Sequence, residues 1–145
     1  MKILVCTDGS EQSQKALEKA SLIAGGCNAD EVAIIYVYEV IPFHDETYSK
    51  EALERHEQLQ KEKKKEGEMI LHNAITFLKE KGINARTIFK EGHPAETIVE
   101  VGCGEGFDFI VIGSRGLGGL KKALLGSVSN AVVQQAEKCS VVVVR

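Results

Sequence analysis

The sequence has little of what several protein classes require. Tryptophan is absent, and the 145 residues include only two prolines and four cysteines, none in a C-x-x-C pair. No apolar run reaches the roughly 18 to 20 residues of a membrane span, and the N-terminus lacks the apolar stretch and cleavage site of a signal peptide. We therefore expect a cytoplasmic protein that has no membrane segment.

A surplus of charge of one sign is also lacking. The chain carries 18 basic and 21 acidic residues, a formal net charge of −3, which argues against a nucleic-acid partner. A hydrophobic share of 43% can build a core, and the length is typical of one domain. We expect a single domain over residues 1–145. In a reducing compartment its scattered cysteines Cys6, Cys27, Cys103 and Cys139 are expected to be small buried apolar residues.

Apolar runs and helical stretches alternate along the chain. The pattern predicts strands at 2–7, 32–38, 83–89, 108–112 and 140–144. It predicts helices from Ser10 to a stop at Gly25-Gly26, over 49–81, after Pro94, and between the last two strands. Strands that are apolar on both faces are typical of a parallel sheet covered by helices on both sides. With right-handed crossovers, the result is a single-domain, doubly wound α/β sandwich of three layers with a five-stranded parallel sheet.

Glycines and serines gather where such a sheet binds ligands, at the carboxyl ends of its strands. Thr7-Asp8-Gly9-Ser10 follows the first strand, 113–119 (GSRGLGG) follows the fourth, and Gly126-Ser127-Val128-Ser129 opens the last helix. Glycines let backbone N–H groups approach an oxyanion, and a helix N-terminus adds free N–H groups and a partial positive charge. Serine hydroxyls donate further hydrogen bonds, and the cations Arg115, Lys121 and Lys122 can screen a polyphosphate. The spacing fits neither a Walker loop nor a dinucleotide fingerprint.

These segments carry a family resemblance. Gly113-x-x-Gly116, nine residues and then Gly126-Ser127 match the pattern G-2x-G-9x-G-[ST]. With 7–10 (TDGS), 92–95 (GHPA) and 141–144 (VVVV), the whole chain resembles the universal stress protein family in its ATP-binding branch. The resemblance implies one universal stress protein domain over 1–145, with strand order 3-2-1-4-5, in the adenine nucleotide alpha hydrolase-like fold.

The resemblance also implies roles for individual residues. Asp8 would lie near the nucleotide and hold Mg²⁺ (or Mn²⁺), Val37 would contact the adenine, and Ile112 would approach the ribose and phosphates. The phosphate side would be formed by Gly113, Gly116, Gly126, Ser127, Val128 and Ser129, with Thr7, Arg115 and Gly118 as further candidates. A homodimer through the last strand, 140–144, is implied too, and this apolar strand would otherwise be an uncovered edge. Cys6 departs from the family pattern, where proline is common.

We expect an ATP-binding regulator of the stress response in which ATP orders the glycine segment for a protein partner. Hydrolysis is expected to be slow or partner-dependent, because the sequence places no second acid beside Asp8. Two other classes remain open: a nucleotide hydrolase or adenylyl-transfer enzyme on the same scaffold, and a nucleotide-free dimerisation module. Asp8 can also be simply part of the N-cap region of the first helix, and the glycine segment a plain connection.

Overall fold

The computed structural model describes residues 1–40, 49–116 and 125–145. The mixed polarity of 41–48 and its proline predict a surface loop, and these residues lie outside the described ranges. Gly118, Gly119, Lys121 and Lys122 lie outside them too. In chain order the elements are β1 (Lys2–Cys6), α1 (Glu11–Cys27), β2 (Glu31–Tyr38), α2 (Lys50–Glu80), β3 (Arg86–Glu91), α3 (Pro94–Gly104), β4 (Phe109–Gly113), α4 (Ser127–Gln135) and β5 (Ser140–Val144).

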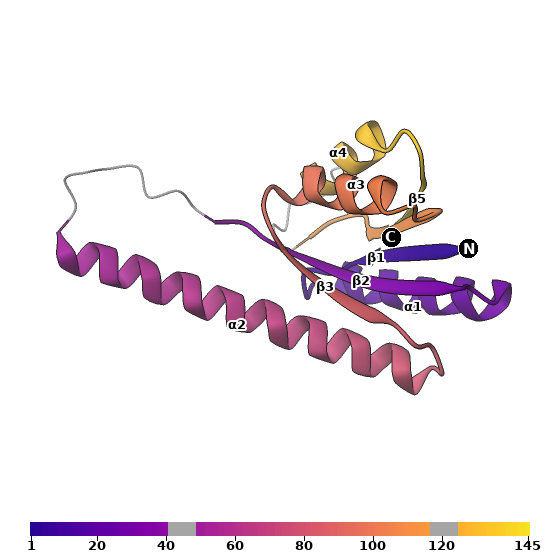
Figure 1. Ribbon diagram of the computed structural model, residues 1–145, viewed down its shortest axis with the longest axis horizontal. Coiled ribbons are helices and arrows are strands. Elements are labelled where there is room, and N and C mark those ends of the chain that lie inside the picture. Colours follow the sequence, from indigo (N-terminus) through magenta and orange to yellow (C-terminus); the bar gives the residue numbers. More distant parts are fainter. Residues whose placement is uncertain (41–48, 117–124) are drawn as a thin grey trace.

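The five strands form one parallel sheet in the order β3-β2-β1-β4-β5 (Figure 1). From β1 the chain winds through β2 to β3 at one edge, then returns across β1 to β4 and β5 at the other. The winding therefore reverses between the neighbouring strands β1 and β4. The predicted doubly wound α/β fold and its strand order are confirmed.

Alternate residues of the strands build two separate cores, one on each face of the sheet. In β1, Ile3 and Val5 pack with α1 and α2, whereas Leu4 and Cys6 pack with α3 and α4. Figure 1 shows these two helix pairs on opposite sides of the sheet. Because both faces are covered, strands without polar alternation are stable here, as their composition indicates.

Two predicted boundaries are wrong for local reasons. Helix α1 continues through Gly25-Gly26 and ends at Asn28, which adopts a left-handed conformation (φ 47°) and donates its N–H to Ala24 O. Strand β3 begins at Arg86 rather than at Ile83, because the Ile83 N–H donates to Leu78 O and so still belongs to the turn that ends α2. In both places a backbone hydrogen bond at the end of a helix sets the boundary, and the pattern of apolar side chains does not reveal it.

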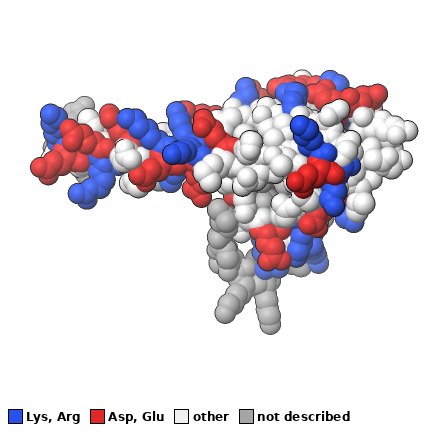
Figure 2. Space-filling view, turned by 90° about the horizontal axis from the view of Figure 1, so that it is seen from below, with Lys and Arg blue, Asp and Glu red and all other residues white. Residues whose placement is uncertain are grey.

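Helix α2 extends well beyond the sheet in its first half (Figure 1). Its buried residues, Gly67, Leu71, Ala74 and Leu78, all lie in the second half. The stretch 61–66 is exposed throughout, as its charge predicts, and Figure 2 shows both signs of charge interspersed along the projecting part. In the three described ranges no helix is both long and apolar enough to cross a membrane.

Gly67 lets α2 approach the aromatic side chains of the sheet. A Cβ at this position would lie 2.5 Å from Tyr36 Cε1 and 2.8 Å from Phe89 Cε2, two rings that stack on each other with centroids 5.7 Å apart. The clash exceeds the gain in helix propensity, so Gly67→Ala is expected to lower the free energy of unfolding by about 1 to 2 kcal/mol. Urea denaturation measures this change.

The matched control is Gly25→Ala in α1, where a Cβ meets nothing within 4 Å. That variant is expected to keep or raise the free energy of unfolding, since it gains helix propensity without a clash. Equal urea midpoints for the two variants would contradict the close approach at Gly67.

Candidate functional site

A cavity of about 310 Å³ opens at the carboxyl ends of β1 and β4. The two strands are neighbours, but the chain leaves β1 toward α1 on one face and β4 toward α4 on the other, so a crevice remains between the two connections. The cavity brings together every predicted site residue except Gly118, which lies outside the described ranges. These residues are Thr7, Asp8, Val37, Ile112, Gly113, Arg115, Gly116, Gly126, Ser127, Val128 and Ser129.

The lining also includes residues that were not predicted as site residues: Cys6, Ser13, Ile35, Pro94 and Ile98. Two sequence signals could have found some of them. Ile35 lies two residues before Val37 on β2 and thus faces the same side of the strand. Ile98 lies one helical turn after Pro94 at the start of α3, where a helix presents its first inward residue.

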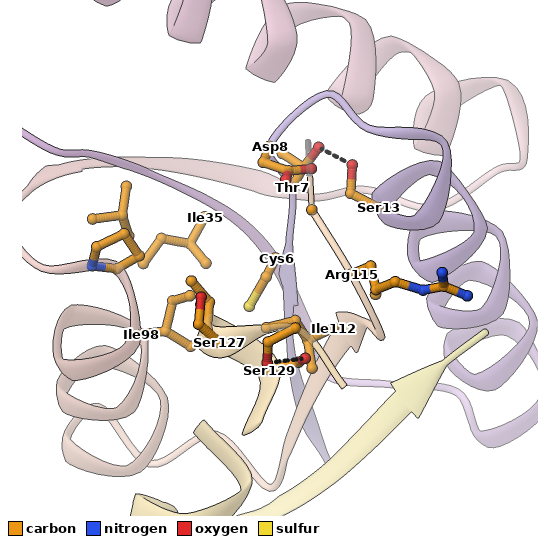
Figure 3. Close-up of a pocket in the computed structure, with 16 residues that line it drawn as sticks. Cys6, Thr7, Asp8, Ser13, Ile35, Ile98, Ile112, Arg115, Ser127 and Ser129 are labelled. Atoms are coloured by element: carbon orange, nitrogen blue, oxygen red, sulfur yellow. Dashed lines mark hydrogen bonds between the residues drawn. The ribbon is translucent and has the colours of Figure 1, made fainter. Parts of the chain in front are cut away.

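One end of the cavity is apolar. Ile35 of β2, Ile98 of α3 and Ile112 of β4 lie there around the Cys6 side chain (Figure 3). Val37 of β2 also lines the cavity. Ile35, Ile98 and Ile112 are buried and belong to the core between the sheet and α3 and α4. Such a surface suits a flat aromatic group better than a charged one.

Cys6 is part of this apolar wall and not a reactive group. Its side chain is 6% exposed. Burial, and after it the negative charge of Asp8, raises the pKa of the Cys6 thiol far above its ordinary value. The sulfur therefore stays protonated at neutral pH and behaves as a small apolar side chain.

The turn after β1 forms the opposite, polar end. Asp8 Oδ1 accepts a hydrogen bond from the Ser10 N–H at 2.9 Å, and Ser10 Oγ accepts one from the Ser13 N–H at 3.1 Å as the N-cap of α1. Thr7 Oγ1 accepts from the Gly9 N–H at 3.3 Å and lies 3.2 Å from Ser13 Oγ. Asp8 thus shapes the start of α1 through one oxygen, while its second oxygen faces the segment after β4.

The segment that begins at the end of β4 passes close to the turn after β1 and to the start of α1 at two glycines. A Cβ on Gly116 would lie 2.5 Å from Asp8 Oδ2, and a Cβ on Gly113 would lie 2.8 Å from both the carbonyl carbon and the carbonyl oxygen of Gln12 in α1. A side chain at Gly113 would meet backbone atoms of α1, whereas a side chain at Gly116 would have to displace the Asp8 carboxylate. The glycines bring main-chain groups, not side chains, to the cavity.

The start of α4 leaves backbone donors unused. The Gly126 N–H and Ser129 Oγ both donate to Ser114 O, at 2.7 and 2.9 Å, which pins the helix start to the end of β4. Gly126 is the N-cap and has no side chain to accept from the first-turn N–H groups. The Ser127 hydroxyl is exposed and has no hydrogen-bond partner among the described residues. Free donors and the positive end of the helix dipole thus gather at the cavity.

Charged groups at the cavity are few. Among its described lining residues Asp8 is the only carboxylate and Arg115 the only cation. Arg115 is exposed, makes no ion pair within the described ranges, and points away from the apolar side chains (Figure 3). The same part of the chain holds no group of three histidine, cysteine or acidic residues that could bind a metal by itself.

Comparison with known proteins decides the family. The family model described as the universal stress protein family matches residues 1–145. The chain belongs to the universal stress protein family. It is 40% identical to the universal stress protein YxiE of Bacillus subtilis over 147 aligned positions, which cover 99% of this chain and 98% of that protein.

Solved universal stress proteins share the fold. Universal stress protein UspA from Lactobacillus plantarum superposes with a TM-score of 0.85 at 24% identity, covering all of this chain and 97% of the other. A universal stress protein in complex with cAMP superposes with a TM-score of 0.70 at 25% identity, covering all of this chain and 97% of that one. The resemblance read from the glycine and serine segments is thereby confirmed at the level of family and fold.

Proposed function

We propose that this universal stress protein binds adenine nucleotides, with ATP and Mg²⁺ as its ligand, and acts as a nucleotide-dependent regulator with slow or partner-dependent hydrolysis. One observation carries the proposal: the cavity joins an apolar slot to a cluster of unused backbone donors at a helix start. A nucleotide has the same division into a flat base and an anionic phosphate chain.

The apolar end is assigned to the base. The Ile35 and Ile98 side chains offer two faces for an aromatic ring, and Val37 follows Ile35 on the same side of β2. Because no charged side chain of the described lining lies among these apolar residues, an uncharged base is favoured. The universal stress protein solved with cAMP supports an adenine nucleotide in particular.

The glycine-lined end is assigned to the phosphates. Free N–H groups at the start of α4, the unpartnered Ser127 hydroxyl and the guanidinium of Arg115 all suit an anion. The Gly116 backbone can approach a phosphate closely because it carries no side chain. Ser129 contributes by fixing Gly126 through the shared acceptor Ser114 O.

Asp8 is the residue that would hold Mg²⁺. A protein carboxylate and nucleotide phosphates together commonly bind this ion, which keeps several of its waters. A single carboxylate next to the phosphate end fits that arrangement, and the free Oδ2 of Asp8 faces the phosphate side. The ion would neutralise phosphate charge that Arg115, the one cation among the described lining residues, leaves uncompensated.

Slow hydrolysis follows from what surrounds the phosphates. Efficient hydrolysis needs a group that orients the attacking water as well as a metal. Asp8 is the only described carboxylate of the lining, and as a metal ligand it is not free for a second role. Single-turnover measurements with ATP and Mg²⁺ are expected to give rates well below 1 s⁻¹, roughly the low end of typical enzymes. A rate at or above that value would overturn this part of the proposal.

A thermal-shift titration with a panel of nucleotides tests the assignment of the base. Ligands that bind only the folded state raise the melting temperature with concentration. ATP, AMP and cAMP are expected to do so, whereas inorganic triphosphate, which lacks the base, is expected to have a much smaller effect. Equal shifts for ATP and inorganic triphosphate would overturn the assignment of the apolar slot, and no shift with any nucleotide would overturn the proposed function.

We further propose a homodimer through β5. The two edges of the sheet differ in chemistry: β3 (RTIFKE) carries charged residues, whereas β5 (SVVVV) carries none. Val141, Val142 and Val143 of β5 are only partly buried. An uncharged, apolar edge strand favours pairing with another strand, and a second copy of β5 is self-complementary.

Val142→Lys is expected to convert this dimer into a monomer at low micromolar concentration, because the substitution places a charge in the proposed interface. Light scattering after size exclusion measures the molar mass. The control is Val133→Lys on α4, a position that is 43% exposed and is not part of the β5 edge. The control is expected to remain dimeric, and an unchanged mass for Val142→Lys would refute the interface.

A further inference from the structure

Two cysteines form a covalent link that the sequence did not predict. Cys103, in the last turn of α3, and Cys139, directly before β5, form a disulfide with a Cα–Cα distance of 5.4 Å. The expectation that all four cysteines are small buried residues is wrong in two ways. Cys103 and Cys139 are bonded and only partly buried, and the free Cys27 is exposed; Cys6 alone fits the expectation.

The link closes a segment that contains much of the cavity. The two cysteines are 36 positions apart in the sequence, and the segment between them includes β4 and α4. Helices α3 and α4 cover the same face of the sheet. Each contributes a residue to the cavity wall, Ile98 from α3 and Ser127 from α4. A bond between the end of α3 and the start of β5 therefore holds together the layer that forms one wall.

Both bonded cysteines are only partly buried. Both cysteines belong to the partly exposed rim of the core between the sheet and α3 and α4, in contrast to Cys6, which lies inside it. Accessible disulfides exchange with small thiols more readily than buried ones. In a cytoplasm, the compartment that we expect from the sequence, a disulfide is usually transient and redox-sensing.

We propose that Cys103 and Cys139 are a reversible redox site that regulates the nucleotide cavity: the oxidised protein binds nucleotide more tightly than the dithiol form. The regulatory part rests on the proposed function, whereas the redox site does not. The oxidant is a low-molecular-weight disulfide, such as glutathione disulfide, and the reductant is the corresponding thiol.

Oxidation of the two cysteines by the small disulfide takes two exchange steps. One cysteine thiolate attacks a sulfur of the small disulfide, which forms a mixed disulfide and releases one small thiolate that takes up a proton. The second cysteine thiolate then attacks the protein sulfur of the mixed disulfide and releases a second small thiol. The two cysteines together lose two protons and two electrons, and the small disulfide gains both.

The bond acts by restricting the chain. In the dithiol form only non-covalent contacts hold the segment between Cys103 and Cys139 in place. The unfolded and partly opened states therefore have more conformational entropy than in the oxidised protein. For a closed loop of this length we expect the melting temperature to fall by roughly 10 °C on reduction. Because the wall built by α3 and α4 is then less preorganised, we expect the Kd for ATP to rise by at least about fivefold, the lower end of ordinary coupling between sites.

The first experiment tests the redox site alone. The full chain is equilibrated in glutathione buffers of graded disulfide-to-thiol ratio, and thiol counts, intact mass and melting temperature are measured. As the share of glutathione disulfide increases, wild type and the control Cys27→Ser are each expected to lose two free thiols reversibly. The melting temperature of each protein is expected to rise over the same range of buffers. Cys103→Ser and Cys139→Ser are expected to melt at one temperature in all buffers. A bond that resists reduction in the folded protein, or one that never forms, overturns the proposal.

The second experiment tests the coupling. ATP with Mg²⁺ is titrated calorimetrically into oxidised and reduced wild type and into Cys103→Ser. Tighter binding by the oxidised form, with no redox effect in Cys103→Ser, supports the coupling. Equal affinity in both states overturns the coupling but not the proposed function. Binding in neither state overturns the proposed function and the coupling with it, while the thiol counts still decide the redox site.

Discussion

Replacing Gly116 with valine is expected to abolish ATP binding while the protein stays folded. The new Cβ would start 2.5 Å from Asp8 Oδ2, so the side chain must displace the carboxylate or move into the space assigned to the phosphates. Gly116 is itself exposed, so the core is not disturbed. Calorimetric titration with ATP and Mg²⁺ measures the loss, and circular dichroism with a melting curve shows whether the fold is kept.

Two further variants make this result specific. Gly25→Val, in α1, adds the same side chain where nothing lies within 4 Å and is expected to bind ATP like wild type. Gly126→Val is expected to lose binding too. Its Cβ would fit tightly against backbone atoms, 3.3 Å from Arg115 Cα and 3.4 Å from Ser114 O, and the larger side chain would obstruct the donors at the start of α4. Normal binding by both Gly116→Val and Gly126→Val would show that the site is assigned wrongly.

Gly113→Val is expected to destabilise the whole protein by about 3 kcal/mol, at the upper end of ordinary overpacking. The position is buried, and the Cβ would lie 2.8 Å from the carbonyl carbon and oxygen of Gln12. These are backbone atoms at the start of α1, which cannot turn aside as a side chain can. Relief requires α1 to move away from β4, and α1 packs along the core beneath it. Urea denaturation measures the change in free energy of unfolding.

Gly104→Val at the end of α3 is the comparison, since a Cβ there meets nothing within 4 Å. We expect its free energy of unfolding to stay within about 0.5 kcal/mol of wild type, as for most surface substitutions. If Gly113→Val unfolds at the wild-type urea concentration, α1 does not approach β4 as closely as described.

The sequence predicts the architecture because burial on both faces leaves a clear pattern. The inner strands β1, β2 and β4 are largely apolar runs, and the helices between the strands set the crossovers, so the layers of the fold follow from the pattern. The strand order was implied by the family resemblance and is confirmed by the structure. The boundaries that failed depend on single hydrogen bonds. Asn28 ends α1 by adopting a left-handed conformation, and Ile83 donates back to Leu78. Neither event is visible in the hydrophobic period.

The polar side of the cavity was predictable for a different reason. Thr7, Asp8 and the glycines at 113 and 116 lie at or just after the carboxyl ends of β1 and β4, where a reversal of winding places a crevice. The apolar side was less accessible to prediction. Ile98 looks like any core residue of a helix, and only the packing of α3 over the sheet brings it beside Ile112.

The disulfide could not be predicted from spacing. Cys103 and Cys139 are separated by a strand and a helix, and they meet because β5 pairs with β4 while α3 lies over the same face. Ser140 N donates to Asp108 O, which aligns the start of β5 with the start of β4, close to the end of α3. The contact is a property of the tertiary fold.

A calorimetric titration of ATP with Mg²⁺ into the full chain tests the central claim most directly. We predict a saturating heat with one nucleotide per chain, which disappears in Gly116→Val and is kept in Gly25→Val. The absence of heat with wild type at high micromolar ATP, in both the oxidised and the reduced protein, would contradict the assignment of the cavity as a nucleotide site.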